Sequence, residues 1–158
     1  MPGYGIQGPA QGTGLLPWSW ATERLTRSHD YWVATVRPDG RPHVMPVWGV
    51  WGDDALWFSS SLRSSKARNL AADPRCAITT DNPPEPVVLE GTAVAVRDAE
   101  AIQGFAARLG AKYETDYGVD FFDPDVNATY RITPTWAFGL VESDFEGSPT
   151  RWDFVERP

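Results

Sequence analysis

The first half of the chain alternates between runs of β-forming apolar residues and short polar segments. The apolar runs predict three strands, at residues 31–37, 42–51 and 55–60. The segments between them, 38–41 and 52–54, read Pro-Asp-Gly-Arg and Gly-Asp-Asp, which are strong turn signals. We therefore expect these three strands to form an antiparallel meander.

The second half of the chain continues this pattern with less regular spacing. Further strands are expected at residues 75–80, 87–97 (with a bend or bulge at Gly91), 130–133, 136–141 (hinged at Pro134) and 151–155. Helical spacing predicts helices at about 17–28, 63–72 and 99–113, and residues 117–129 are expected to form a loop. These elements predict an all-β-dominated domain, a small β-barrel with flanking helices.

The composition fits one globular domain and excludes several classes of partner. The 158 residues, of which 42% are hydrophobic and 22% charged, are enough for a single core. Residues 1–16, rich in Gly and Pro, are expected to be a flexible arm, and 17–158 to form the domain. The formal net charge of −7 argues against nucleic acid as a partner. The pattern contains neither a signal peptide nor a long apolar run, which predicts a cytoplasmic protein without membrane contact.

The sequence lacks the residues that a metal site or a catalytic nucleophile would need. The two histidines, His29 and His43, have no Cys or acidic residue at ligand spacing, so no metal site is predicted. No serine lies in a nucleophile elbow, which argues against a hydrolase. The single cysteine, Cys76, lies in a predicted strand and is expected to be buried.

A serine-rich turn followed by a short helix is the strongest candidate for a binding site. Its polar residues are Ser59, Ser60, Ser61, Ser64, Ser65, Lys66 and Asn69. Hydroxyls, a lysine and the positive end of a helix dipole together favour an anion such as a phosphate. On this helix, Ala67, Leu70 and Ala71 form the apolar side, and Lys66 and Asn69 lie on the opposite side. A capped surface helix with a solvated lysine is the alternative.

A flat group is expected beyond the phosphate, along the second predicted strand. In this scheme Met45, Pro46, Val47 and Trp48 run next to the third strand. Pro46 indicates a sheet edge or a bulge, and a bulge would turn backbone N–H and C=O groups outward toward a heterocycle. Core packing is the alternative role for Trp48 and Trp51.

The order of these motifs resembles the pyridoxamine-phosphate-oxidase-like split barrels. The resemblance rests on segments 38–42, 45–48, 58–61, 64–70 and 130–139, within residues 18–142. It implies a homodimer of six-stranded antiparallel split barrels, with two cofactor sites in the interface that hold FMN or the deazaflavin F420. Lys66 and the five serines would hold the phosphate, supported by Asn69. Met45 to Trp48 would line the ring, and Pro86 or Val87 of the partner subunit would close the site.

The resemblance implies an oxidoreductase, and two segments favour one branch of the family. Residues 136–139 read Trp-Ala-Phe-Gly in place of an acidic-aromatic Glu-Phe-Trp-Gln-Gly signature, which argues against pyridoxal phosphate synthesis. The segment 64–70, Ser-Ser-Lys-Ala-Arg-Asn-Leu, is closer to the F420-using branch. The expected function is hydride transfer between F420 and a small unsaturated or quinone-like substrate. An FMN-dependent oxidoreductase and a non-catalytic flavin, deazaflavin or haem binder are the alternatives.

No motif identifies a catalytic residue or the substrate. Tyr130 and His43 are candidate proton donors, alongside water. Loops 81–86 and 117–129 are expected to form the substrate walls, because loops carry specificity on such scaffolds. A structural dimer with an empty cleft is a further alternative.

Overall fold

Strands dominate the computed structural model, which describes residues 5–7 and 11–154 except for the side chain of Val119. The helices are α1 (Trp18–Arg27), α2 (Ser65–Ala72) and α3 (Ala99–Tyr113), with 3-10 helices η1 (Val119–Phe122) and η2 (Glu142–Asp144). The strands are β1 (Asp30–Val36), β2 (Pro42–Gly52), β3 (Ala55–Ser61), β4 (Arg75–Thr80), β5 (Val87–Val96), β6 (Asn127–Gly139) and β7 (Thr150–Asp153).

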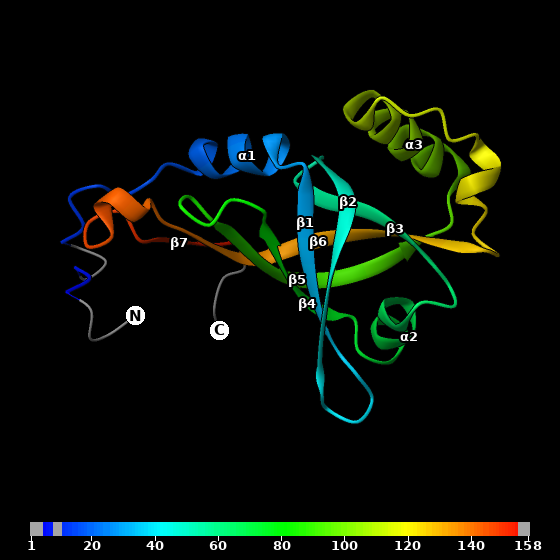
Figure 1. Ribbon diagram of the computed structural model, residues 1–158, viewed down its shortest axis with the longest axis horizontal. Coiled ribbons are helices and arrows are strands. Elements are labelled where there is room, and N and C mark those ends of the chain that lie inside the picture. The colour runs from blue at the N-terminus through cyan, green and yellow to red at the C-terminus, as the bar shows by residue number, and fades with distance from the viewer. Residues whose placement is uncertain (1–4, 8–10, 155–158) are drawn as a thin grey trace.

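The strands form one antiparallel sheet that closes on itself. Their order is β3-β2-β1-β4-β5-β6-β7, and β3 also pairs with β6, which closes six strands into a barrel. β7 pairs with residues 136–139 of β6, outside the closed part. In Figure 1, α1 and α3 lie above the barrel and α2 lies below it, on the same side as the β1–β2 hairpin. The expected fold, an all-β-dominated six-stranded antiparallel split barrel with flanking helices, is confirmed.

Strand β2 belongs to two different pairs, and this splits the barrel. Residues 42–48 pair with β1, whereas residues 49–52 pair with β3. Residues 59–61 of β3 pair with β6 instead. Among the described residues, segment 42–48 therefore diverges from β3 and has one edge without a neighbouring strand.

Pro46 lies on this open edge and not in a bulge. It pairs with Trp32, in a register with β1 that runs without interruption from residue 42 to residue 48. A proline is accommodated where its missing N–H would face no neighbouring strand. The predicted edge position is confirmed, whereas the predicted bulge and the placement of residues 44–48 next to the third strand are wrong.

Strand β6 is continuous across Pro134. The two pieces predicted around that proline form one strand of 13 residues, which starts at Asn127 inside the segment predicted as a loop. The pairing with β5 shifts register between Glu90 and Gly91, so the irregularity predicted at Gly91 is confirmed, although the extra residue belongs to β6. Because the partners of these two residues are not consecutive in β6, Thr135 is the extra residue of a bulge.

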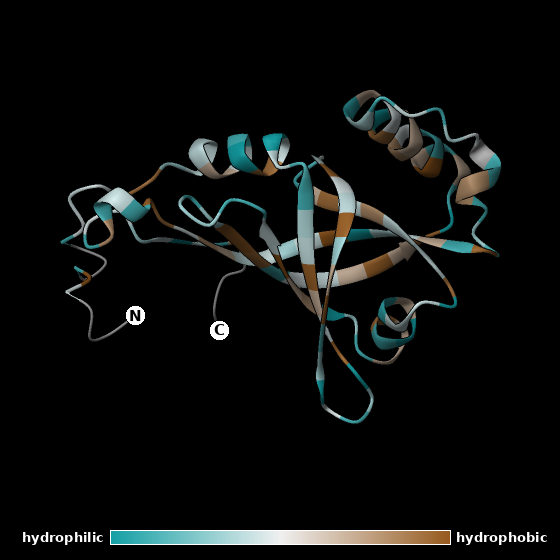
Figure 2. Cartoon of the chain, viewed as in Figure 1, coloured by the Kyte–Doolittle hydropathy of each residue, from teal (hydrophilic) through white to brown (hydrophobic). Residues whose placement is uncertain are grey.

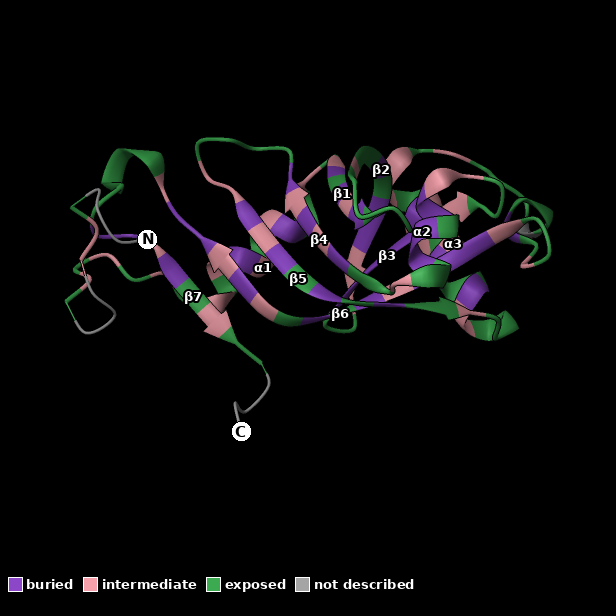
Figure 3. Ribbon diagram, turned by 90° about the horizontal axis from the view of Figure 1, so that it is seen from below, coloured by how far each residue is buried: buried purple, intermediate pink, exposed green. Residues whose placement is uncertain are grey.

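Two apolar cores stabilise the domain. The first fills the barrel, where Tyr31, Phe58 and Ile132 are fully buried. The second lies between the barrel wall and α3, where Trp57 stacks on Phe105. Figure 2 shows brown apolar residues along the strands, and Figure 3 shows burial alternating along them, as expected for a sheet with two different faces.

The N-terminal segment lies against the C-terminal part of the chain. The Gly14 N–H donates to the Gly147 carbonyl at 3.2 Å, and the Leu16 N–H donates to Thr150 Oγ1 at 2.9 Å. Residues 1–4 and 8–10 of the predicted arm lie outside the described residues, as does residue 155 of the last predicted strand. The flexibility of the arm and its boundary at residue 16 stay predictions.

Candidate functional site

The serine-rich turn forms the N-terminal cap of α2. Ser64 has an extended backbone, and its Oγ accepts a hydrogen bond from the Ala67 N–H at 3.0 Å. The Ser64 Oγ also lies 3.0 Å from the Ser60 Oγ at the end of β3. These two hydroxyls therefore lie together at the positive end of the helix dipole.

Strand alternation separates the other strand serines from this pair. Successive side chains of β3 point to opposite faces, so Ser59 and Ser61 face away from Ser60. The Ser59 Oγ donates to the Ala128 carbonyl at 3.3 Å, and the Ser61 Oγ accepts from the Arg63 N–H at 3.2 Å. The Ser59 O–H is thus engaged by a backbone carbonyl, whereas Ser61 only accepts and its own O–H can still donate. The part of these two serines in binding an anion stays a prediction.

Helix α2 turns its lysine inward. Lys66 is 7% exposed and Asn69 is 2% exposed, whereas Ala71 is exposed. The predicted burial of Ala67 and Leu70 is confirmed, but the predicted burial of Ala71 and the position of Lys66 opposite the apolar side are wrong. The buried arc of the helix contains two apolar and two polar residues, so hydropathy alone misplaces it.

Lys66 has no bonding partner among the residues that the structure describes. Its Nζ forms neither a hydrogen bond nor an ion pair with them. Burial lowers the pKa of Lys66 below its ordinary value, because the charged form is poorly solvated there. A buried, unpaired cation is unfavourable, and a bound anion would supply the missing partner.

Ser65 lies at the start of the same helix and faces Arg68. The Arg68 guanidinium donates to the Ser65 Oγ at 3.2 Å and to the Arg63 carbonyl at 2.7 Å. Arg68 is exposed, so this basic side chain is solvated while Lys66 is not. The two neighbouring cations therefore offer a matched comparison between an exposed and a buried charge.

A polar group formed by Thr35, His43 and Asn69 lies beside Lys66. Asn69 Nδ2 donates to Thr35 Oγ1 at 2.9 Å, and this oxygen lies 3.5 Å from His43 Nδ1. Burial, and then the positive charges of Arg37 and Lys66, lower the pKa of His43. These surroundings favour the neutral form of His43, and its role as a proton donor stays a prediction. Sequence reasoning missed Thr35, because only the pairing of β1 with β2 brings it to this group.

Tyr130, the other candidate proton donor, lies in the barrel core. Its ring packs against Phe58 with 5.2 Å between ring centroids, and the residue is 5% exposed. Burial raises the pKa of its hydroxyl. Its role as a proton donor stays a prediction.

The predicted ring-binding residues divide between the two faces of β2. Directly opposed residues share a face, so Met45 and Val47 lie on the side of the buried β1 residues. Met45 is nevertheless 47% exposed, because β3 has diverged at this point. Pro46 and Trp48 lie on the outer face, and Trp48 is 40% exposed. Core packing is therefore realised for Trp51 but not for Trp48.

The residues predicted to close the site from a second subunit lie at the start of β5. Val87 is fully buried in the barrel core, and its N–H donates to Thr80 Oγ1 at 3.0 Å. Pro86 is partly exposed next to it. Their contact with a cofactor across a subunit boundary stays a prediction.

A second lysine lies half-buried beneath the point where β2 changes partner. Lys112 Nζ donates to Tyr31 Oη and to the Gly49 carbonyl, both at 2.9 Å. Burial lowers the pKa of Lys112 to about 8, although the negative charge of Asp30 acts in the opposite direction. Burial also raises the pKa of the adjacent Tyr113 to about 12.

We expect folding stability to report the titration of Lys112. Its pKa is about 8 in the folded protein against an ordinary value of 10.5, so between these values the unfolded chain binds more protons. The wild type should therefore gain about 1 to 2 kcal/mol relative to Lys112→Met as the pH rises from 8 to 10.5, after allowance for partial exposure. Chemical denaturation of both proteins across this pH range measures the difference. A pH-independent difference would contradict the assignment.

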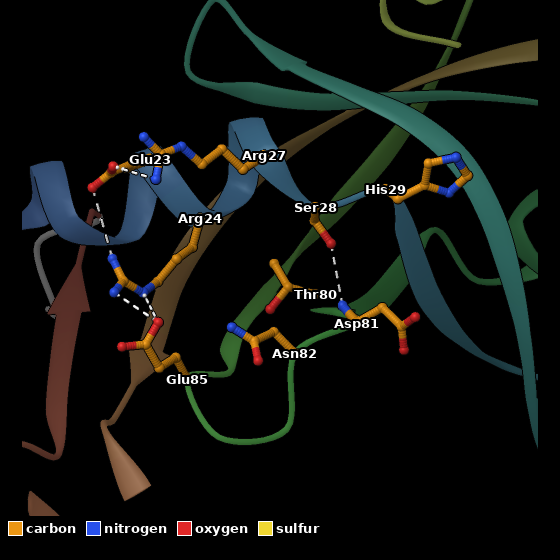
Figure 4. Close-up of a pocket in the computed structure, with 9 residues that line it drawn as sticks. All are labelled: Glu23, Arg24, Arg27, Ser28, His29, Thr80, Asp81, Asn82 and Glu85. Atoms are coloured by element: carbon orange, nitrogen blue, oxygen red, sulfur yellow. Dashed lines mark hydrogen bonds and ion pairs between the residues drawn. The ribbon is translucent and has the colours of Figure 1, made fainter. Parts of the chain in front are cut away.

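A polar cavity of about 320 Å³ lies between the end of α1 and the loop before β5. Figure 4 shows the arginine and glutamate side chains pointing toward one another, while the Asp81 carboxylate and the His29 ring point away from them. Arg24 pairs with Glu85 at 2.8 Å, and Arg27 pairs with Glu23 at 2.8 Å. Because these guanidinium groups are already neutralised, the cavity attracts a phosphate less than an unpaired lysine does.

An apolar groove of about 700 Å³ lies between the N-terminal segment and β7. Leu15, Trp136 and Phe138 contribute to its lining. It contains none of the residues predicted to bind a cofactor. The groove is therefore separate from the α2 site in this chain.

Within residues 5–7 and 11–154, no three His, Cys, Asp or Glu side chains lie close enough together to hold a metal ion. The expected burial of Cys76 is confirmed, and burial raises the pKa of its thiol to about 12. In the same part of the chain, every helix is too short or too polar to cross a membrane.

Comparison with known proteins identifies one family. The model of the family described as pyridoxamine 5'-phosphate oxidase matches residues 21–139, which extend from α1 to the end of β6. No curated protein matches the chain.

Several solved structures share the fold. A conserved hypothetical protein, Rv2991 from Mycobacterium tuberculosis, is 23% identical, with a TM-score of 0.70 over 87% of this chain and 85% of that chain. A protein named F420 reductase is 28% identical, with a TM-score of 0.58 over 73% of this chain and 93% of that chain. The heme storage protein HutZ from Vibrio cholerae is 21% identical, with a TM-score of 0.61 over 72% of this chain and 87% of that chain. Because the family model covers every strand of the barrel, the chain belongs to the pyridoxamine 5'-phosphate oxidase family.

Proposed function

We propose that the protein is an F420-dependent oxidoreductase that transfers hydride between this deazaflavin and a small unsaturated or quinone-like substrate. The observation that carries the proposal is Lys66, a lysine that is only 7% exposed, lies in the first turn of α2 and has no partner for its ammonium group among the described residues. A phosphate fits such a position, because it pairs with the lysine and with the positive end of the helix. Family membership and the 28% identity with an F420 reductase support the choice of cofactor.

Different parts of the chain would hold the two ends of the cofactor. Lys66, with the hydroxyls of Ser60 and Ser64, binds the phosphate, and Asn69 keeps this face of α2 against β1 through Thr35. Ser61 and Ser65 only accept in their contacts, so their O–H groups can still donate to the phosphate, whereas the Ser59 O–H donates to a backbone carbonyl. When bound, F420 supplies the ring that carries the hydride.

The open edge of β2 would receive the ring. Residues 44–48 pair with β1 on one side, and the structure describes no strand on their other side. Backbone groups on such an edge are available to the edge of a heterocycle. Met45 and Val47 then flank the ring from one face of the strand, and Pro46 and Trp48 flank it from the other.

We also propose that the protein acts as a homodimer. The outer face of β1 and β2 exposes Trp32 (39%), Val44 (50%) and Trp48 (40%), and the register places Pro46 directly opposite Trp32. A contiguous exposed apolar patch of this kind is typical of a protein interface. A second copy on this face would bring Pro86 or Val87 of the partner subunit to the cofactor. The cytoplasmic location stays a prediction from the sequence alone.

FMN is the alternative cofactor, because its phosphate would fit Lys66 equally well. The preference for F420 rests on segment 64–70 and on the similarity to the F420 reductase. The similarity to the heme storage protein shows the fold alone at 21% identity, so no observation favours haem.

Titration of the purified protein with F420 and with FMN tests this proposal. We expect saturable F420 binding, weaker FMN binding, and oxidation of bound reduced F420 by members of a panel of enones and quinones. Binding of FMN alone would establish the alternative cofactor. F420 binding without hydride transfer to any member of the panel would indicate a non-catalytic carrier. Light scattering of the same sample measures whether the protein is a dimer.

A further inference from the structure

Strand β2 changes its pairing partner from β1 to β3 at Gly49, and residues of α3, outside the barrel, contact it there. Gly49 is the first residue of β2 that pairs with β3, and the preceding residue is the last that pairs with β1. A Cβ on Gly49 would lie 2.8 Å from the Trp57 carbonyl oxygen and 3.3 Å from the Tyr31 ring. Only glycine allows the strands to approach so closely at this position.

The end of α3 binds both backbone groups of Gly49. The Gly49 N–H donates to Tyr113 Oη at 2.9 Å, and the Gly49 carbonyl accepts from Lys112 Nζ at 2.9 Å. The Tyr113 hydroxyl lies 3.0 Å from the same carbonyl and also contacts the His29 carbonyl, so its single proton serves one of the two at a time. Two consecutive residues of α3 therefore fix the strand where it leaves β1.

The ring of Tyr113 also orients Trp48. The two rings stack with 4.4 Å between centroids and 7° between planes. The His29 ring meets them edge-on, at 5.1 Å from the Tyr113 ring and 6.2 Å from the Trp48 ring. Trp48 is thus 40% exposed and yet held in one orientation by an aromatic neighbour.

We propose that Tyr113, assisted by Lys112, is a positioning residue that fixes the open edge of β2 and Trp48 for the cofactor ring. Among the described residues, no second strand holds this edge. The contacts of Tyr113 and Lys112 with the backbone of Gly49, called the clamp below, restrain its end. The inference rests on the proposed function in that segment 44–48 receives the ring. The phosphate end of the site lies on α2 and has no part in the clamp.

Substitution Tyr113→Phe separates the clamp from the rest of the structure, because it removes the hydroxyl and keeps the stacked ring. Tyr117→Phe is the matched control for hydrogen exchange at Gly49, since Tyr117 is 43% exposed and its ring stacks on Phe121. If Tyr113→Phe does not fold, Lys112→Met removes the donor to the Gly49 carbonyl, and the comparison then rests on the affinities for F420 and phosphate, because the Gly49 N–H stays bonded to Tyr113.

Three measurements on the full-length variants decide the matter. Hydrogen exchange of the Gly49 amide should accelerate about 3- to 10-fold in Tyr113→Phe and stay unchanged in the control, as expected for the loss of one hydrogen bond. F420 affinity should fall by a similar factor, while affinity for inorganic phosphate stays constant.

Unchanged exchange at Gly49, or an equal loss of F420 and phosphate affinity, would overturn the clamp as a positioning device. A wild-type protein that binds phosphate but not F420 contradicts the proposed function instead. In that case the exchange rates alone decide whether the clamp exists.

Discussion

Replacing Lys66 with methionine is expected to remove most of the affinity for phosphate and for the cofactor while the barrel stays folded. The lysine is 7% exposed and has no partner among the described residues, so an anion is the group that its charge can serve. Loss of one buried charge-assisted contact should weaken binding by about 2 to 3 kcal/mol, or roughly 30- to 150-fold in Kd. Calorimetric titration of both proteins with F420 and with inorganic phosphate measures the change.

The same substitution should leave the ligand-free protein as stable as the wild type, or more stable by about 1 kcal/mol, because it removes a poorly solvated cation. A stabilised variant that no longer binds would show that the lysine is retained for binding and not for folding. Arg68→Met is the control, since it removes an equal charge from the exposed side of α2. If the two variants lose affinity equally, the effect is one of net charge and Lys66 is not the anion ligand.

Gly91→Ala is expected to destabilise the barrel strongly. A Cβ at this position would lie 2.3 Å from the Thr133 carbonyl oxygen and 3.1 Å from the Pro134 Cα, both backbone atoms of the facing strand. Neither strand can move aside easily, because β5 and β6 are paired over most of their length. We expect a loss of about 3 kcal/mol or more, and a decrease in Tm of about 6 to 12 °C.

Gly104→Ala, in contrast, is expected to increase the stability of the protein. Gly104 lies on the exposed side of α3, and a Cβ there would meet nothing within 4 Å. Alanine should stabilise the helix by about 0.5 to 1 kcal/mol, because it has the higher helix propensity. Thermal unfolding of the two variants measures both effects. A Gly91 variant as stable as the wild type would mean that the bulge beside Thr135 relaxes without cost.

Features that depend on a few neighbouring residues were predictable from the sequence. The turn at 38–41 forms as expected, with the Arg37 N–H donating to the Arg41 carbonyl at 2.9 Å and Gly40 at a φ of +84°. The cap at Ser64 and the irregularity at Gly91 also follow from local chemistry. Hydroxyl geometry and steric limits on φ and ψ act within a few residues, so a short segment suffices to predict them.

The inward turn of Lys66 was not predictable from hydropathy. A lysine is normally placed on the solvated side of a helix, and α2 contains enough apolar residues to suggest a different buried arc. The side of α2 that is buried depends on the residues that pack against it. One of these is Thr35 on β1, which accepts a hydrogen bond from Asn69 although the two residues are 34 positions apart in the sequence. Tertiary packing therefore decides which face of α2 is buried.

The sequence by itself determined the three-strand meander, the turns within it and the residue types of the serine-rich turn before α2. Only the tertiary structure decided that β2 leaves β1 for β3 at Gly49, that Ser59 and Ser61 face away from Ser60, and that the end of α3 reaches Gly49. The physical reason is that strand partners and buried faces depend on contacts between residues distant in sequence, which local propensity does not encode.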